Sequence, residues 1–231
     1  MIKITKRSAV HFKAGIEKTV ERDKWTVVLA YKDEGRGPYL VDLSHKTRWD
    51  LQDKNLSGFR PLGREVPADP GECHLQDGIM IYRMNRTQAV IWQLNADAAE
   101  MPTESAYTNV SDVSTSLALF GPNALSVVEK LCALDLHNPH QEPPFLLQGP
   151  FSHVPCHLVI MERGQGFDGG MLLTCSRGYA DSMLHAILDA GDKFGLRAAG
   201  EQRFADWMER LSGRGWFQDR TASASVGIRA M

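Results

Sequence analysis

The stretch SDVSTSLALFGPNAL, residues 111–125, decides the fold. Ser116–Phe120 is typical of a buried β-strand, which Gly121-Pro122 ends. Apolar residues then recur at helical spacing over Asn123–Leu134, so a helix follows the strand directly. A similar opening, VDLSHKTRWDLQ, stands at residues 41–52, and both openings place Asp, an apolar residue and Ser ahead of a strand. The two openings therefore suggest an internal duplication of a unit that contains both strands and helices.

Each unit continues with a loop and a β-hairpin. The other predicted elements are strands at Trp25–Tyr31, Tyr39–Leu43, Thr47–Leu51, Ile79–Met84, Gln88–Leu94, Ser152–Met161 and Gly170–Cys175, one helical turn at Ala96–Glu100, and helices at Tyr179–Phe194 and Gln202–Leu211. We therefore expect residues 1–105 to form the first α+β unit with an N-terminal extension. Residues 106–211 form the second unit, and residues 212–231 form a tail that is loose or bound to a partner.

The composition is that of an ordinary globular chain. The 231 residues are 43% apolar and 23% charged, and the formal net charge is −2. This near balance gives no support for nucleic-acid binding through bulk charge. No apolar run matches a secretory signal or a membrane span, so we expect a cytoplasmic protein without a membrane partner.

Cysteine and histidine spacing gives no metal signature. The chain has four cysteines and no C-x-x-C pair, which favours buried free thiols: Cys73, Cys132, Cys156 and Cys175. His153 and His157 share one face of a predicted strand, but two ligands alone do not make a zinc site. We therefore expect no metal.

The glycines of Gly164-x-Gly166-x-x-Gly169 formally match a dinucleotide-binding fingerprint. That motif requires a helix after the glycines, whereas the strand-like run MLLTC follows them here. A hairpin loop is the better interpretation. With no phosphate-binding loop elsewhere, we expect no flavin or NAD site in this chain.

Polar residues at two strand ends allow structural and functional interpretations. Asp42 and Asp112 precede serines and are expected to cap turns through side-chain hydrogen bonds to backbone N–H groups. Arg177 begins R-G-Y-A between a strand and the longest predicted helix. It lies either in a simple glycine turn or where it meets an anionic ligand or a partner.

Longer stretches of the second unit resemble a known superfamily. The unit reads SDVSTSLALFGPNALSVVEKLCALDL and, later, GGMLLTCSRGYADSMLHAILDAGDKFGLRAAG. It resembles the folate-binding aminomethyltransferases, which include the glycine-cleavage T protein, and within them the γ subunits of heterotetrameric sarcosine oxidases. The likeness covers about Val41–Gly200. It implies a duplicated unit of antiparallel sheet with packed helices, as in the folate-binding domain of that superfamily.

The resemblance also implies site residues. In T-protein-like enzymes an acid at the start of the first unit's hairpin meets the reacting amine and the folate. Alignment on IMIYRM places that position at Gln76-Asp77, so Asp77 is the candidate catalytic residue. Asp168 stands where the family has the glutamate of T-G-E. With Tyr82 and Arg177, it is a candidate for binding the cofactor that the resemblance implies, tetrahydrofolate.

Two functions follow from the resemblance. The first is a non-catalytic or weakly folate-binding subunit of a sarcosine-oxidase-like, amine-demethylating oxidoreductase in one-carbon metabolism. Larger oxidoreductase subunits would then be its partners and would carry the flavin and NAD. The alternative is a stand-alone tetrahydrofolate-dependent methyl- or aminomethyltransferase. The first is favoured by the missing nucleotide motif and by Leu172, which stands where the family has a glutamate. A third, less favoured reading is a scaffold or ligand-binding protein of another pathway.

Overall fold

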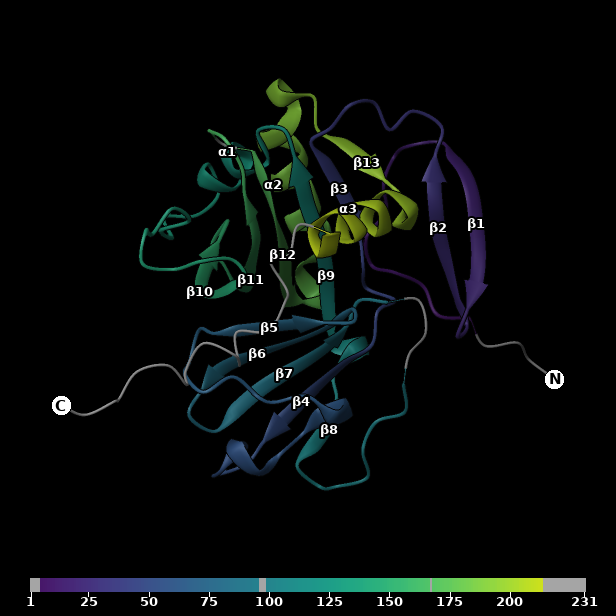
Figure 1. Cartoon of the computed structure of the whole chain (residues 1–231). Coiled ribbons are helices and arrows are strands. Elements are labelled where there is room, and N and C mark those ends of the chain that lie inside the picture. Colours follow the sequence, from purple (N-terminus) through teal and green to yellow (C-terminus); the bar gives the residue numbers. More distant parts are fainter. Residues whose placement is uncertain (1–4, 96–98, 167, 214–231) are drawn as a thin grey trace.

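Two large β-sheets, one stacked beneath the other, dominate the computed structural model, which describes residues 5–95, 99–166 and 168–213 (Figure 1). The upper sheet has six strands in the order β10-β11-β12-β9-β3-β13. Their bounds are β10 Phe145–Phe151, β11 Val154–Arg163, β12 Gly169–Ser176, β9 Ser114–Gly121, β3 Tyr39–Asp42 and β13 Arg197–Ala199. All neighbours in it are antiparallel except β13 and β3, which are parallel.

The lower sheet has five antiparallel strands in the order β5-β6-β7-β4-β8. Their bounds are β5 Cys73–Gln76, β6 Ile79–Asn85, β7 Gln88–Gln93, β4 Arg48–Gln52 and β8 Tyr107–Asn109. A separate hairpin of β1 (Ile16–Arg22) and β2 (Trp25–Tyr31) stands beside the upper sheet. The class is therefore α+β, as predicted.

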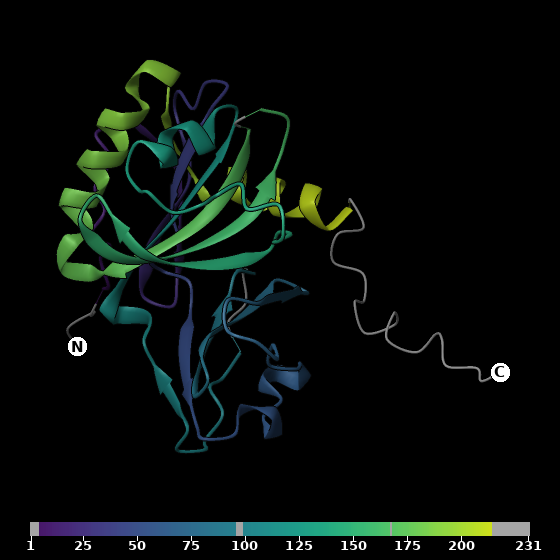
Figure 2. The same ribbon diagram turned by 90° about the vertical axis from the view of Figure 1, so that its left-hand side faces the viewer.

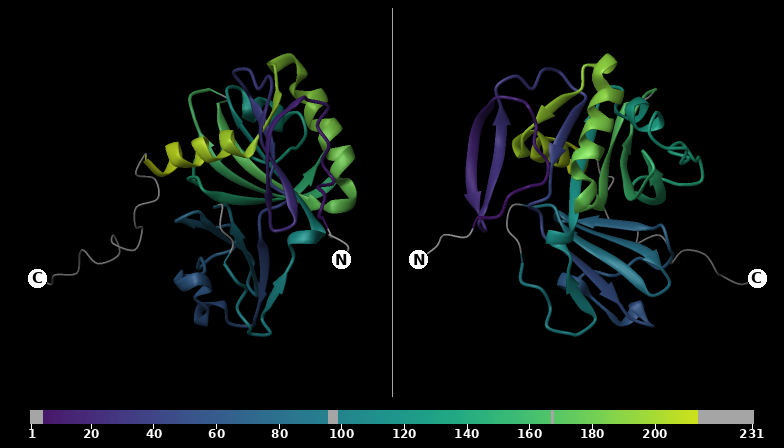
Figure 3. Two further views of the ribbon diagram at one scale, coloured as in Figure 1. Left: turned by 90° about the vertical axis from the view of Figure 1, so that its right-hand side faces the viewer. Right: turned by 180° about the vertical axis from the view of Figure 1, so that it is seen from behind.

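Helices cover both faces of the six-stranded sheet. α1 (Ala124–Glu129) and α2 (Ala180–Gly191) pack on its outer face, and α3 (Glu201–Gly213) crosses the opposite face (Figures 2 and 3). Short 3₁₀ turns connect other elements: η1 Leu56–Gly58, η2 Pro61–Gly63, η3 Ser111–Val113, η4 Arg177–Tyr179 and η5 Asp192–Phe194. Within the described part of the chain, every helix is too short or too polar to cross a membrane.

Three apolar cores follow from this arrangement. The first joins α1 and α2 to the outer face of the six-stranded sheet, with Ile187 fully buried. The second lies between the two sheets and extends under α3, where the rings of Phe120 and Trp207 stack at 4.4 Å. The third covers the far face of the five-stranded sheet, where Leu51 packs with Leu56 of η1. Both faces of both sheets are therefore covered.

The two large sheets share one strand order. In each, a first strand (β4 or β9) is followed by a meander whose last strand (β7 or β12) pairs back with the first. The strand just before each first strand pairs in the other sheet: β3 joins β9, and β8 joins β4. Both sheets thus draw strands from either side of residue 105, and the division of the chain at that point stays a prediction.

The chain passes from one large sheet to the other between β3 and β4 and again between β8 and β9, and these two connections have matching turns. In the first, Asp42 Oδ1 accepts a hydrogen bond from the backbone N–H of Ser44 at 2.9 Å. In the second, Asn109 Oδ1 accepts one from the backbone N–H of Ser111 at 3.0 Å. Asp42-Leu43-Ser44 therefore corresponds to Asn109-Val110-Ser111, three residues before the Asp112-Val113-Ser114 that the sequence comparison paired with it.

Each connection also accepts a hydrogen bond from the strand that follows the other connection. Ser44 Oγ accepts a hydrogen bond from the backbone N–H of Ser116 at 3.2 Å, and Ser111 Oγ accepts one from the backbone N–H of Arg48 at 2.9 Å. Ser116 and Arg48 occupy equivalent places near the start of β9 and at the start of β4. Ser44 in the first connection thus bonds β9, and Ser111 in the second connection bonds β4.

Several predictions about elements need correction. The helix that begins near Asn123 ends at Glu129, not at Leu134. The turn-capping role is confirmed for Asp42, whereas Asp112 forms an ion pair with Lys6 at 2.9 Å. The turn expected at 96–100 and the tail from 212 lie mainly outside the described residues. The sequence did not predict strands β1, β5, β8, β10 and β13.

Candidate functional site

Between the two sheets, polar side chains interrupt an otherwise apolar core. Arg48 on β4, Tyr82 on β6 and Trp92 on β7 come from the five-stranded sheet, and His157 on β11 and Thr174 on β12 come from the six-stranded sheet. Arg48, Tyr82, Trp92 and Thr174 are each at most 5% exposed, and His157 is half-buried. We call these five residues the inter-sheet polar centre.

Strand alternation places Arg48 in this centre. Successive side chains of a strand point to opposite faces, and Trp49 and Leu51 face the third core. Arg48 therefore faces the upper sheet. It pairs directly across the ladder with Trp92, and its guanidinium carbon lies 5.6 Å from the centre of the indole ring. At this distance the cation is attracted by the face of the ring.

Tyr82 and His157 join the two sheets across the centre. Their ring centres lie 6.4 Å apart in a T-shaped arrangement. His157 pairs directly with Thr174 on the neighbouring strand, so both side chains point to the same face of the six-stranded sheet. Residues that are far apart in the sequence are thus brought together by the stacking of the sheets.

Burial and charge alter the ionisation of the centre. Burial, together with the charge of Arg48, lowers the pKa of His157 to about 4, although Asp50 opposes this shift. His157 is therefore neutral near pH 7. Burial raises the pKa of Tyr82, and Arg48 and the nearby hydroxyl of Thr174 partly offset the increase. The phenol is therefore protonated and can donate a hydrogen bond.

Several polar atoms of the centre lack partners. Arg48 Nε and Nη1, Tyr82 OH, Trp92 Nε1 and Thr174 Oγ1 are buried and make no hydrogen bond to any described residue. A buried polar group without a partner costs about 1–3 kcal/mol, and a charged group costs more. Each buried polar group left unpartnered in a folded protein calls for an explanation, such as a bound ion or water, so the inter-sheet polar centre is our candidate site.

The residues predicted from the sequence do not form one site. Tyr82 belongs to the inter-sheet polar centre. Asp77 lies in the exposed turn between β5 and β6, where its carboxylate accepts a hydrogen bond from Arg64 Nη2 at 2.9 Å. Asp168 is exposed before β12, and its Oδ1 accepts a hydrogen bond from the backbone N–H of Asn123 at 2.9 Å, just before α1.

Arg177 has a structural partner of its own. Its guanidinium donates a hydrogen bond to the backbone carbonyl of Arg7, which ties η4 to the N-terminal segment. The glycine-rich run that begins at Gly164 joins β11 to β12, so the prediction of a hairpin loop is confirmed. In the described ranges, no group of three or more His, Cys, Asp or Glu side chains is placed to hold a metal ion.

Tetrahydrofolate does not fit the inter-sheet polar centre. The edge of a pterin presents N–H donors and needs acceptors opposite them. The unpartnered atoms of Arg48 and Trp92 are themselves N–H donors. The nearest carboxylate, Asp50, already accepts hydrogen bonds from Gln52 and Gln88. No step of a folate-dependent reaction is therefore assigned to these residues.

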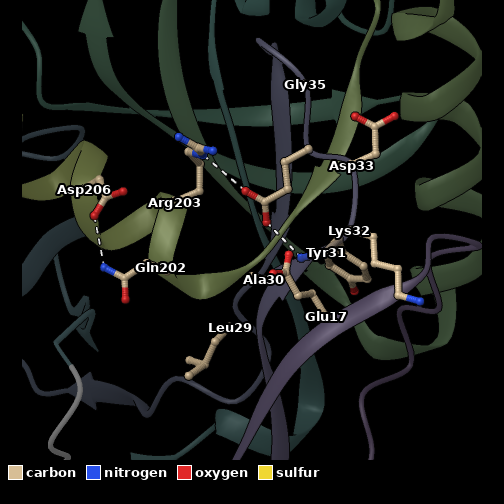
Figure 4. A pocket seen from close by; sticks show the side chains of 11 residues that line it. Glu17, Leu29, Ala30, Tyr31, Lys32, Asp33, Gly35, Gln202, Arg203 and Asp206 are labelled. Carbon is tan, nitrogen blue, oxygen red and sulfur yellow. Dashed lines mark hydrogen bonds and ion pairs between the residues drawn. The ribbon is translucent and has the colours of Figure 1, made fainter.

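A hollow of about 430 Å³ lies between the end of β2 and α3 (Figure 4). Two of its charged groups, Glu34 and Arg203, bond each other. Glu34 accepts hydrogen bonds from the backbone N–H groups of Tyr31 and Gly200, at 3.1 and 2.8 Å, and from Arg203 Nε at 3.2 Å. Gln202 donates one to Asp206 at 3.0 Å. This hollow therefore attaches α3 to the strands and presents no comparable set of unpartnered atoms.

Comparison with known proteins links the chain to one solved complex. No protein-family model matches the sequence, and no curated protein matches it. Among solved structures, a match is found with a chain of the heterotetrameric sarcosine oxidase from Corynebacterium sp. U-96, solved in complex with pyrrole 2-carboxylate. The TM-score is 0.56 at 18% identity, over 67% of this chain and 84% of that chain. The fold of this protein is therefore similar to that of a sarcosine oxidase chain.

Proposed function

We propose that this chain is a non-catalytic subunit, similar to a γ subunit, of an amine-demethylating oxidoreductase related to heterotetrameric sarcosine oxidase. The observation that carries the proposal is the fold likeness, which extends over 84% of a chain that works within a heterotetramer. In this proposal, larger partner subunits hold the flavin and NAD. We place the assembly in the cytoplasm and in one-carbon metabolism.

A duplicated unit supports the same assignment. We propose that the fold is that of the folate-binding domain of the T-protein superfamily, with units at residues 1–105 and 106–211. The shared strand order of the two large sheets favours duplication. So do the reciprocal hydrogen bonds of Ser44 and Ser111, since two copies of one ancestral unit would meet through equivalent residues.

The partners of the family-derived site residues support a non-catalytic role. A catalytic carboxylate is usually held in a pocket with an altered pKa. Asp77, the candidate catalytic residue, is exposed and paired with Arg64. Asp168 and Arg177, proposed for the cofactor, bind backbone groups of this chain. Their hydrogen bonds serve the fold of the protein.

Affinity capture from the native host tests the proposal. A tagged chain, expressed at its natural level, is expected to co-purify in fixed stoichiometry with larger oxidoreductase chains and with flavin absorbance. A tagged chain that purifies alone, or only with copies of itself, would contradict the subunit role.

The alternative is a tetrahydrofolate-dependent transferase that acts alone. Titration calorimetry of the folded protein with tetrahydrofolate separates the two functions. Binding in the micromolar range that Asp77→Asn or Asp168→Asn weakens would favour the transferase. The subunit proposal predicts that these substitutions leave assembly with the larger chains unchanged.

A further inference from the structure

The inter-sheet polar centre holds a buried cation without an acceptor. Arg48 is 5% exposed, and its Nε and Nη1 have no hydrogen-bond partner in the described ranges. Its guanidinium carbon lies 5.6 Å from the centre of the indole ring of Trp92. A buried guanidinium whose N–H groups have no acceptor loses hydration without regaining hydrogen bonds.

The neighbouring carboxylate makes no hydrogen bond with Nε or Nη1 of Arg48. Asp50 lies two residues along the same strand and its charge reaches Tyr82 and His157, but its oxygens accept hydrogen bonds from Gln88 Nε2 at 2.9 and 3.1 Å and from Gln52 Nε2 at 2.5 Å. His157 is neutral near pH 7. The centre therefore holds a guanidinium whose Nε and Nη1 lack an acceptor among the described residues, beside further unpartnered donors.

The other unpartnered atoms of the centre include further donors. Trp92 Nε1 is a donor only, whereas the hydroxyls of Tyr82 and Thr174, which lie near each other, can each donate or accept. These side chains come from both sheets. A ligand with negative charge and several lone pairs can accept from the guanidinium, the indole and a hydroxyl.

We propose that the inter-sheet polar centre binds a small carboxylate anion, with Arg48 as its counter-ion and Tyr82, Trp92 and Thr174 as further donors. A carboxylate only accepts hydrogen bonds, offers about four lone-pair directions and matches the planar guanidinium. These four side chains are at most 5% exposed, so a ligand that contacts them is enclosed between the sheets. This site does not depend on the proposed subunit role.

Thermal unfolding in matched salts tests the site. The probe is sodium formate, compared with sodium chloride at the same ionic strength, on the isolated chain. At a formate concentration of about ten times Kd, Tm is expected to be about 2–4 °C higher than in chloride. Arg48→Met, which keeps the bulk and removes the charge, is expected to lose this difference.

The control is Arg197→Met, because Arg197 is exposed on β13 and its guanidinium donates a hydrogen bond to the carbonyl of its neighbour Leu196. It is expected to retain the whole formate effect. Equal Tm values in formate and chloride for the native protein would overturn the proposal. So would an undiminished formate effect in Arg48→Met.

A second pair of variants keeps the test decisive if Arg48→Met does not fold. Tyr82→Phe removes one unpartnered hydroxyl with almost no change in volume. It is expected to reduce the formate shift. Tyr107→Phe, on the far face of the five-stranded sheet, is expected to leave it unchanged. A full formate shift in Tyr82→Phe would mean that the anion binds elsewhere and would overturn the proposal.

Discussion

His157 reports on the electrostatics of the inter-sheet polar centre. Its pKa falls from an ordinary value of 6.5 to about 4, chiefly through burial and then through the charge of Arg48. A lowered histidine pKa favours the neutral form in the folded state. The contribution to stability is therefore complete above about pH 6.5 and is lost as the pH falls towards 4.

Replacing His157 should flatten this pH dependence. Between pH 7 and pH 4 the native protein is expected to lose on the order of 2–3 kcal/mol of unfolding free energy through this residue, allowing for its partial exposure. His157→Gln should remove that part of the slope, as measured by urea unfolding at each pH. The exposed His140→Gln should keep it. Equal slopes in the native protein and in His157→Gln would contradict this account.

Arg48 shows why residue-scale prediction was incomplete. The run R-W-D-L alternates charged and apolar side chains, which is the usual pattern of a strand with one face in water. In the structure the second sheet covers the charged face, and η1 covers the apolar one. Only the packing of two sheets reveals this. Tyr82 could be found because a hairpin pattern and a family resemblance both pointed to its strand.

At the scale of elements, Glu201 anchors α3. It is the first residue of the helix and is buried. Its carboxylate lies 2.8 Å from Arg22 Nη1 on β1 and 3.1 Å from His45 Nε2, and it also bonds the buried Lys46. The residue therefore ties the helix to the hairpin and to the junction between β3 and β4.

Glu201→Gln should destabilise the protein by about 3 kcal/mol, because it leaves the buried Lys46 and the half-buried Arg22 without their counter-ion. Burial acts to raise the pKa of Glu201, but hydrogen bonds with His45 and Arg22 and the charge of Lys46 hold it well below its usual range. This stabilisation is thus complete above about pH 4.5 and fades as the pH falls further. The exposed Glu209→Gln serves as control. A loss no larger than in the control would argue against the anchoring role.

The serines of the two connections between the sheets, Ser44 and Ser111, give a second prediction at the scale of elements. Ser44→Ala and Ser111→Ala each remove one acceptor for the first strand of the other unit. Both should lower the unfolding free energy by about 1 kcal/mol, as measured by chemical denaturation. The exposed Ser105→Ala should have almost no effect. A measurable loss of unfolding free energy in only one of these two variants would mean that the two connections are not equivalent.

Prediction of elements succeeded where the sequence pattern was long. The periodic apolar residues from Met183 to Ile187 and beyond identified α2, and the β-branched run from Trp25 identified β2. Strands of three or four residues, such as β8 and β13, are held by pairing with distant strands and have little pattern of their own. The sequence comparison paired Asp42-Leu43-Ser44 with Asp112-Val113-Ser114, which lies three residues after the matching turn in the structure. An asparagine, Asn109, takes the place of the expected aspartate.

At the scale of the whole molecule, two features combine. The fold is similar to that of a chain of heterotetrameric sarcosine oxidase, and the chain contains a buried, donor-rich centre where the two sheets meet. The centre lies between parts of the chain that are far apart in sequence. No motif reveals it, whereas the α+β class could be predicted from the family resemblance over about Val41–Gly200.

The mass of the native particle is the most direct test of the subunit role. The untagged protein is fractionated from its host, and its mass is measured by light scattering with the visible spectrum recorded at the same elution volume. We predict a particle several times heavier than the 25.7 kDa chain, with flavin absorbance that elutes with it. A monomer or homodimer without flavin would contradict the account.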